Sequence, residues 1–161
     1  MKKRVFRAIP ELCIGCRACE IACSLSKTGV INPALARISV NSTSRNVVIC
    51  RHCKQPPCKE ACPLPEAMII DERTGAVVID EASCIGCLAC VDACPFGALR
   101  LGPDMELLKC DLCCGDPQCV KYCPPRPENH FPHAQYPRTS CLEYVEPLKI
   151  TRKRPAEVKN G

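Results

Sequence analysis

The chain has 161 residues, with 16 prolines, 18 cysteines, few aromatic residues and no tryptophan. This length allows one domain or two small ones, and its apolar core is thin for that length. No apolar run approaches the length that spans a membrane, which excludes direct membrane insertion at this stage. We therefore expect bound cofactors to supply much of the core.

Taken in chain order, the sequence predicts short elements separated by cysteine-rich loops. Residues 5–12 predict a short strand, and residues 18–25 predict a short helix. Three hairpins are predicted from β-forming residues on either side of a turn: 36–49, 67–80 and 98–108. One late strand is expected within residues 141–150. The expected fold class is α+β, with short helices and small antiparallel hairpins.

Sixteen of the 18 cysteines fall into four groups of four, here called quartets one to four. Each quartet begins with C-x2-C and ends with C-x3-C, and three of them are followed by proline. In chain order they are Cys13, Cys16, Cys19, Cys23; Cys50, Cys53, Cys58, Cys62; Cys84, Cys87, Cys90, Cys94; and Cys110, Cys113, Cys119, Cys123. Quartet three reads C-x2-C-x2-C-x3-C-P, the cysteine run of bacterial ferredoxins that bind [4Fe–4S] clusters.

The spacing suits a four-iron cluster, which needs a thiolate at each iron. Two intervening residues let the chain curl so that neighbouring sulfurs reach neighbouring irons. Gly15 and Gly86 lie inside such loops, where the backbone is expected to need a positive φ or a close approach. The last cysteine of each quartet lies one helical turn further on and points away, so we expect it to bind the neighbouring cluster.

Zinc and disulfides are the alternative uses of so many cysteines. Zinc sites normally use separated pairs of ligands, and they do not repeat C-x2-C-x2-C. Disulfides need an oxidising compartment, whereas the first twelve residues contain no apolar segment typical of a secretory signal. We therefore expect a cytoplasmic protein with four [4Fe–4S] clusters.

The formal net charge of +5 counts the thiols as neutral. An oxidised cluster with four thiolate ligands has a net charge of about −2, so four of them bring the total to about −3. The basic balance therefore does not indicate nucleic-acid binding. The basic residues near both ends are interpreted as solvated termini, and docking to an acidic partner is the alternative.

The repeat predicts two dicluster modules resembling bacterial ferredoxins, one nested within the other. Residues 1–46 and 103–124 are expected to form an outer module with quartets one and four. Residues 47–102 form the inner module with quartets two and three. The proline-rich residues 125–161 are expected to form a C-terminal arm that contacts a partner or wraps the body, and a loosely ordered tail is the alternative.

Several motifs resemble the four-cluster iron–sulfur electron-transfer subunits of redox complexes, over about residues 4–125. They are Cys-Ile-Gly-Cys-Arg-Ala-Cys at 13–19, Cys-Arg-His-Cys at 50–53, Cys-Lys-Glu-Ala-Cys-Pro at 58–63, the Thr-Gly hairpin and residues 109–124. Members serve molybdenum or tungsten oxidoreductases, formate hydrogenlyase and CO dehydrogenase-linked hydrogenases. Residues 109–124 resemble the small subunits of tungsten enzymes of the aldehyde ferredoxin oxidoreductase type.

The resemblance implies a ligand set for each cluster, because quartet one pairs with quartet four in this family and quartet two with quartet three. Cluster A would use Cys13, Cys16, Cys19 and Cys123, and cluster B would use Cys23, Cys110, Cys113 and Cys119. Cluster C would use Cys50, Cys53, Cys58 and Cys94, and cluster D would use Cys62, Cys84, Cys87 and Cys90.

A few residues depart from this pattern. Cys114 follows Cys113 directly, so either could be a ligand, and Cys113 is favoured because it preserves the C-x2-C spacing. Cys141 has no quartet and is interpreted as a free buried thiol. His52 lies in a ligand loop, where a solvated or hydrogen-bonded imidazole is favoured over an iron ligand. His130 and His133 are assigned no chemistry.

We expect an electron-transfer subunit without catalytic residues, which passes single electrons. The donor is expected to be a catalytic molybdenum- or tungsten-pterin subunit or another redox subunit. The acceptor is expected to be a partner such as a flavin subunit or ferredoxin. A catalytic reading is disfavoured because no quartet leaves an iron without a cysteine, and no phosphate-binding loop is present. A polyferredoxin that shuttles by diffusion stays open as the alternative. Head-to-tail association of several copies is a further possibility.

Overall fold

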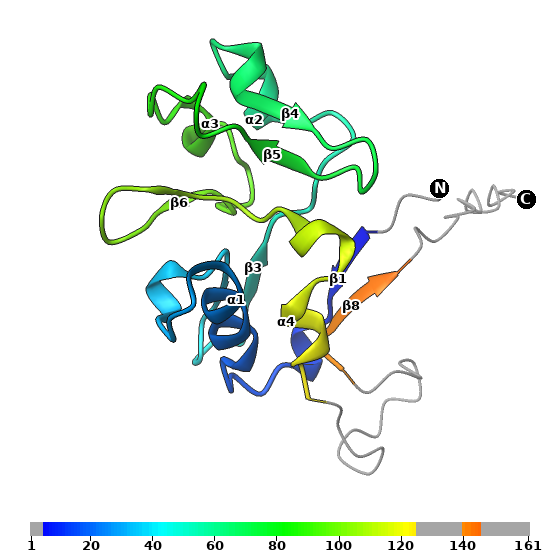
Figure 1. Ribbon diagram of the computed structural model, residues 1–161. Helices are drawn as coiled ribbons and strands as arrows, with labels where there is room; N and C mark the ends of the chain where they lie inside the picture. Colours follow the sequence, from blue (N-terminus) through cyan, green and yellow to red (C-terminus); the bar gives the residue numbers. More distant parts are fainter. Residues whose placement is uncertain (1–4, 125–139, 146–161) are drawn as a thin grey trace, which may run out of the picture.

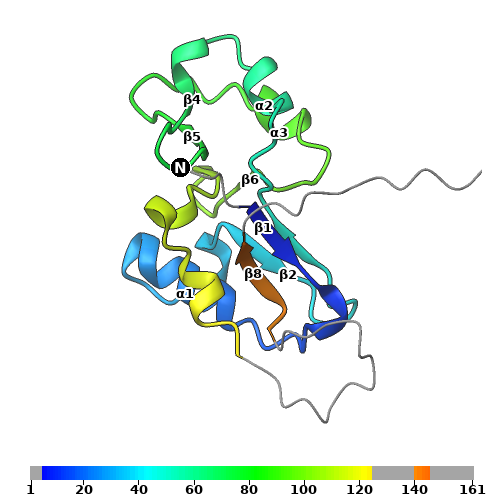
Figure 2. The same cartoon turned by 90° about the vertical axis from the view of Figure 1, so that its right-hand side faces the viewer.

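The computed structural model describes residues 5–124 and 140–145, so His130, His133 and most of the C-terminal arm lie outside the described residues. Within these residues the strands form four two-stranded antiparallel sheets, joined by short helices and loops. Figures 1 and 2 show two groups of elements, with β6 between them. One group contains α1, α4, β1 and β8, and the other contains α2, α3, β4 and β5.

The first group begins with β1 (Val5–Ala8), which is shorter than the strand expected at 5–12 because Pro10 starts a 3-10 turn, η1 (Pro10–Leu12). The expected helix is confirmed as α1 (Ala18–Thr28), which extends three residues beyond Leu25. It ends at Gly29, whose φ of 72° and N–H bond to the Leu25 carbonyl form a left-handed cap. A second 3-10 turn, η2 (Pro33–Leu35), follows.

The three predicted hairpins are all present. The first pairs β2 (Ile38–Val40) with β3 (Val47–Ile49), and the second pairs β4 (Met68–Ile70) with β5 (Val77–Ile79). The third, shorter one pairs β6 (Arg100–Leu101) with β7 (Leu107–Leu108). The expected late strand is β8 (Leu142–Val145), which pairs antiparallel with β1 from the other end of the chain.

Four helices of the ligand segments pack in two pairs. Helix α1 packs against α4 (Gln118–Lys121), which follows the 3-10 turn η4 (Leu112–Gly115). Helix α2 (Pro57–Glu60) packs against α3 (Ala89–Asp92), and the turn η3 (Pro65–Ala67) lies between α2 and β4. The segments of quartets one and four therefore meet, as do those of quartets two and three. The fold is a ferredoxin-like dicluster fold.

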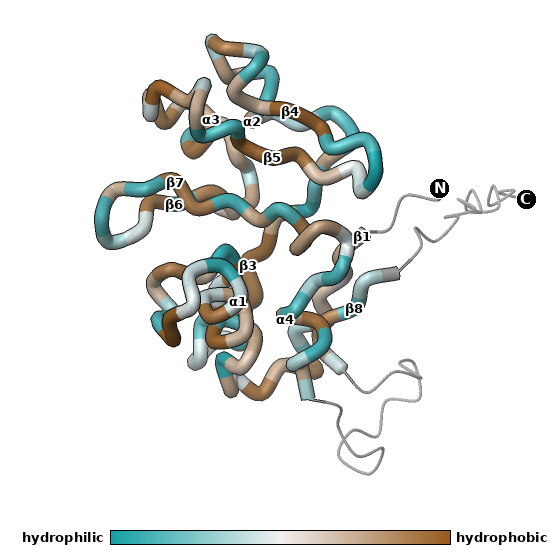
Figure 3. The backbone as a smooth tube through the Cα atoms, viewed as in Figure 1, coloured by the Kyte–Doolittle hydropathy of each residue, from teal (hydrophilic) through white to brown (hydrophobic). Residues whose placement is uncertain are grey.

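The core consists of three small groups of buried residues, and cysteines belong to each. Beside α1, apolar residues such as Ile9, Ile38 and Leu142 surround five buried cysteines. Between the two halves, Ala76 and Leu112 pack with Cys50 and Cys110. Around β4 and β5, three larger residues pack with two cysteines: Met68, Val77, Leu99, Cys58 and Cys90. Figure 3 colours the residues of β3 and β5 brown, because both strands consist of apolar residues.

Candidate metal centres

All four cysteine loops curl in the same way. In each, the residue before the second cysteine has a positive φ: Gly15 (71°), His52 (46°), Gly86 (69°) and Leu112 (61°). This left-handed residue turns the chain so that the two cysteines of a C-x2-C pair lie on one side of the loop. In the first loop the Gly15 N–H also donates to the Cys13 sulfur at 3.4 Å. The positive φ expected at the two glycines is confirmed, and it extends to two residues with side chains.

One cavity is lined by Cys13, Cys16, Cys19 and Cys123. The first three come from quartet one, and the fourth follows α4 at the end of quartet four. Most of the remaining lining is apolar, including Leu12, Ile14, Val40, Val47, Pro124 and Leu142. Arg17 and a fifth cysteine, Cys141, complete the lining. Four thiol donors from two quartets around a mostly apolar cavity are the donor set of a [4Fe–4S] cluster, so the residues present fit that group.

A second cavity is lined by Cys62, Cys84, Cys87 and Cys90. Here the last cysteine of quartet two joins the first three of quartet three. The other lining residues are Leu64, Ala67, Met68, Ile79, Ile85, Leu88 and Leu107, all of them apolar. The two cavities thus repeat one design at opposite ends of the molecule, since the first lies beside α4 and the second beside β4 and α3.

Three thiols of quartet four lie near Cys23, in the middle of α1. Burial raises the pKa of Cys119, and four nearby thiols raise it further: Cys110, Cys23, Cys113 and Cys19. Burial also raises the pKa of Cys23, where an N–H bond from Arg37 opposes the shift and Cys113 adds to it. The last cysteine of quartet one therefore faces three cysteines of quartet four.

Two cysteines of quartet two, Cys50 and Cys58, lie near the last cysteine of quartet three, Cys94. Burial raises the pKa of Cys58; nearby Lys109 opposes this shift, and Cys50 and Cys94 add to it. Cys53 lies in the same loop as Cys50 and is partly exposed. In the described residues, no three His, Cys, Asp or Glu side chains converge tightly enough to bind a single metal ion.

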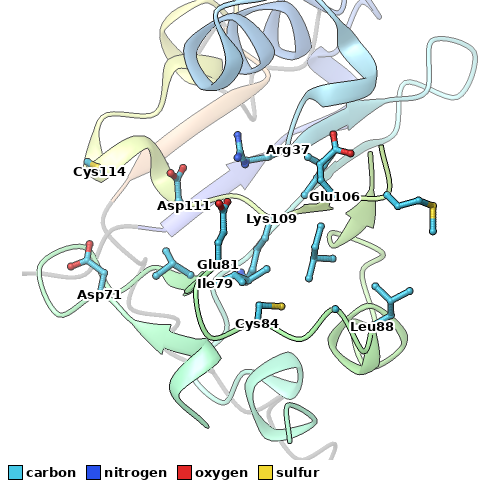
Figure 4. Close-up of a pocket in the computed structure, with 15 residues that line it drawn as sticks. Arg37, Asp71, Ile79, Glu81, Cys84, Leu88, Glu106, Lys109, Asp111 and Cys114 are labelled. Atoms are coloured by element: carbon cyan, nitrogen blue, oxygen red, sulfur yellow. The ribbon is translucent and has the colours of Figure 1, made fainter. Parts of the chain in front are cut away.

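Cys113 and Cys114 point to different surroundings. The Cys113 thiol influences the pKa values of both Cys23 and Cys119, so it lies close to these two thiols. Cys114 is exposed and lines a cleft of about 600 Å³ between the two halves. Figure 4 shows Cys114 at the rim of this cleft, whose lining includes charged side chains of both signs: Arg37, Glu81, Glu106, Lys109 and Asp111.

Cys141 is the site residue that sequence reasoning missed. It is buried at 4% exposure, precedes β8 and lines the first cavity together with the four cysteines of quartets one and four. A hydrogen bond with Cys123, followed by burial and the nearby Cys13 thiol, raises its pKa. The pairing of β8 with β1 brings Cys141 to this cavity, and no local sequence pattern around residue 141 predicts that pairing.

Two buried charged side chains, one basic and one acidic, lie beside cysteines of different quartets. Lys109 is 5% exposed, and its Nζ donates to the Cys50 sulfur at 3.2 Å. Glu20 is 2% exposed; its carboxylate accepts the Val40 N–H at 2.7 Å and pairs with Arg17. Glu20 also adds to the raised pKa of Cys19, about 12, of which burial is the first cause.

Of the roles considered for His52, the structure shows the hydrogen-bonded imidazole. Its ring is 6% exposed, and Nδ1 accepts the Val77 N–H at 3.0 Å. This bond connects the second ligand loop to β5, and it accompanies the positive φ of His52. The imidazole therefore fixes the position of the loop that contains Cys50 and Cys53.

Comparison with known proteins gives the same chemistry. A family model described as "4Fe-4S dicluster domain" matches residues 44–130, and one described as "4Fe-4S binding domain" matches residues 10–29. The polyferredoxin-like subunit of aliphatic sulfonate oxidoreductase from Pyrococcus furiosus is 43% identical over 118 residues, covering 71% of this chain and 68% of that protein. Formate hydrogenlyase subunit 2 of Escherichia coli is 30% identical over 153 residues, covering 70% and 74%.

Some relatives are much longer than this chain. It spans 27% of the beta subunit of NADH-dependent phenylglyoxylate dehydrogenase from Aromatoleum evansii, to which it is 33% identical over 122 residues and which matches 71% of this chain. Among solved structures, the active site complex BamBC of benzoyl coenzyme A reductase with 1,5-dienoyl-CoA is similar, with a TM-score of 0.47 and 23% identity over 100% of this chain and 84% of that one. Within the described residues, no helix is long and apolar enough to cross a bilayer.

Proposed function

Since the chain belongs to the polyferredoxin-like family of 4Fe-4S electron-transfer subunits of oxidoreductase complexes, we propose that it binds four [4Fe–4S] clusters and passes single electrons along them. When bound, each cluster takes up and releases one electron, at a potential set by its surroundings. The proposed ligand sets A to D are those defined above from quartets one to four.

The observation that supports this proposal most strongly is the composition of the two cavities. Each is lined by three cysteines of one quartet and the last cysteine of another. This is the crossed arrangement that sets A and D require. Because the sequence repeats the same quartet four times, the same rule applied to the remaining cysteines gives sets B and C. Their mutual effects on thiol pKa values agree with this assignment.

Effects of thiols on one another's pKa support a row in the order A, B, C, D. For three buried thiols, burial is the first cause of a raised pKa, and a thiol of an adjacent set in this row raises the pKa further. These pairs are Cys119 with Cys19, Cys110 with Cys50, and Cys90 with Cys58. This proximity of thiols from neighbouring sets supports stepwise transfer of single electrons along the row.

Both ends of this row reach the surface. Cys16 of set A and Cys87 of set D are exposed, whereas Cys110 and Cys119 of set B are buried. An apolar side chain lies beside each exposed cysteine, namely Ile14 at 53% and Ile85 at 68% exposure. We propose that one end receives electrons from a catalytic subunit and that the other delivers them to an acceptor.

The proposed partner is a catalytic molybdenum- or tungsten-pterin subunit, with an aldehyde oxidoreductase as the first candidate. Its support is the motif resemblance together with the similarity to a subunit of aliphatic sulfonate oxidoreductase. The acceptor would be another redox subunit, a flavin subunit or ferredoxin. The chain itself would contribute no catalytic residue, because the substrate chemistry belongs to the partner.

A hydrogenase, formate or CO dehydrogenase system is the second candidate partner, favoured by the similarity to formate hydrogenlyase subunit 2. A free polyferredoxin shuttle is the third possibility. Purification from the native source at low ionic strength separates these alternatives. A stable complex with a pterin-containing subunit supports the first, a complex with a hydrogenase subunit supports the second, and a monomer that co-purifies with neither supports the shuttle.

A redox titration followed by EPR tests the proposed function. Four one-electron centres, together with about 16 iron and 16 sulfide per chain, are expected for four clusters. Two or fewer centres in fully reconstituted protein would refute the four-cluster proposal, and so would zinc in place of iron. Substrate turnover by the purified chain alone would refute its assignment as a non-catalytic subunit.

A further inference from the structure

Lys109 is a buried cation at the junction between two proposed ligand sets. It follows β7 and immediately precedes Cys110 of set B, whereas its side chain reaches Cys50 of set C. Only 5% of Lys109 is exposed. A lysine ammonium is costly to bury without a partner, so a lysine in this place needs compensation. The 3.2 Å bond to the Cys50 sulfur is that compensation.

The charge of Lys109 is directed at set C. Its ammonium opposes the raised pKa of Cys58, a second member of this set, so it lies near more than one sulfur. Among the described residues, no carboxylate lies within ion-pair distance of the Lys109 Nζ. No acidic side chain therefore forms an ion pair with it, although Glu81, Glu106 and Asp111 line the same cleft, and its low exposure limits screening by water.

Set A has the opposite surroundings. Glu20, buried directly after Cys19, disfavours a further negative charge on that thiol, although Arg17 offsets part of its effect. Adding an electron makes a cluster more negative, so a nearby cation favours reduction and a nearby anion disfavours it. Hydrogen bonds to sulfur act in the same direction as the cation.

We propose that Lys109 selectively raises the reduction potential of the cluster held by Cys50, Cys53, Cys58 and Cys94. This inference rests on the proposed ligand sets. Lys109 acts through the charge of its ammonium and through its hydrogen bond to Cys50. Lys109 lies one residue before Cys110, between sets B and C. The cluster whose reduction it favours is therefore in the interior of the row, away from both exposed ends.

The test is a redox titration by EPR on the reconstituted full chain with three variants. K109M removes the charge and the donor at nearly unchanged length, and K109R retains the charge. K54M is the matched control, because Lys54 follows Cys53 in the same loop but is exposed. C53S marks the signal of cluster C, since it alters one of its ligands.

K109M is expected to lower the reduction equilibrium constant of the centre marked by C53S at least about tenfold, which is 59 mV for a one-electron centre. The other three centres, and all four in K54M, should shift by much less, and K109R should retain most of the original potential. An unshifted cluster C, an equal shift of all four centres, or a shift in K109R as large as in K109M would overturn the proposal.

If K109M binds fewer than four clusters, K109Q decides instead, because its amide keeps a hydrogen-bond donor without the charge. A lowered potential at the same centre supports the role of the charge, and an unchanged potential refutes it. Failure of the ligand assignment is distinguishable from failure of this inference. The former shows as fewer than four centres in the unmodified chain, and the latter as four centres without a selective shift.

Discussion

The two halves of the molecule hold their cysteines in the same way but differ in how much apolar core they have without metal. The outer half contains α1, an eleven-residue helix, and buries apolar residues such as Ile9, Ile38 and Leu142 around its cysteines. The inner half has α2 and α3, of four residues each, and a smaller buried group around Met68, Val77 and Leu99.

This difference predicts unequal dependence on the clusters. A single helical turn and an isolated two-stranded hairpin are marginal in water by themselves. The inner half consists almost entirely of such pieces, so its order depends on the metal that its cysteines bind. The outer half has an additional strand pair, β1 with β8, and a longer helix that contributes its own buried face.

Removal of iron gives the largest expected effect. After chelation under reducing conditions, the amides of β4 and β5 should lose protection from hydrogen exchange almost to the level of an unfolded chain. The amides of α1 and β2 should retain a measurable part of theirs. Hydrogen exchange with mass spectrometry resolves these segments. Equal loss in both halves, or greater loss in α1, would contradict the comparison.

Removal of single cysteines tests which thiol of quartet four, Cys113 or Cys114, binds a cluster in the outer half. Cys113→Ala should remove one cluster, so that the bound iron falls by about four atoms per chain. Cys114→Ala should retain the full complement, because this exposed thiol lines the cleft. Iron and sulfide assays measure both variants. The opposite pattern would show that Cys114 is the ligand.

Substitutions of two equally buried core residues compare the stability of the two halves. Ile38→Ala in the outer half removes a side chain that is 2% exposed and should destabilise the iron-free protein by about 2–4 kcal/mol. Met68→Ala in the inner half, also at 2% exposure, should change the iron-free protein by less than about 1 kcal/mol, because that region is already unfolded. Urea unfolding measures both values. A similar cost at both positions would show that the inner core forms without metal.

The smallest expected effect concerns the ion pair between Lys27 of α1 and Asp111, 2.7 Å apart, which joins quartets one and four. Burial of Asp111 opposes ionisation, but hydrogen bonds from Lys27 and from the Cys113 N–H outweigh it and hold the pKa below its usual 3.8. A depressed folded-state pKa stabilises the fold above pH 3.8, and this contribution is lost as the pH falls through the lower folded value.

Because the pair is partly exposed, Asp111→Asn should cost about 1 kcal/mol or less at pH 6. The difference from the unmodified chain should shrink only as the pH falls from 3.8 through the lower folded-state pKa of Asp111, where its carboxyl becomes neutral. Urea unfolding of the iron-free protein across this range gives both numbers, with Lys54→Met as an exposed control. A cost that grows towards acid pH would contradict the assigned role of Asp111.

The sequence was sufficient for features with a local signal. The hairpins follow from β-forming residues around a turn, and the metal chemistry follows from cysteine spacing. Features that depend on distant segments were not predictable. The pairing of β8 with β1 places Cys141 beside Cys13 and Cys123, and neither strand contains a signal for the other.

Two further features were hidden by residue type. His52 and Leu112 adopt the left-handed conformation that the sequence indicates only at glycine, because their loops must curl as those of Gly15 and Gly86 do. The role of a long side chain was also out of reach. From the sequence, Lys109 is an ordinary basic residue before Cys110. Its contact with Cys50 depends on the packing of Cys110 and Leu112 against Cys50, a residue far away in the sequence.

The most direct test of the central claim is the location of the iron atoms by anomalous diffraction from crystals of the reconstituted chain at the iron absorption edge. The account predicts four clusters in a row, each bound by three cysteines of one quartet and the last cysteine of its partner quartet. A cluster bound by all four cysteines of one quartet, or fewer than four clusters in a fully loaded protein, would contradict it.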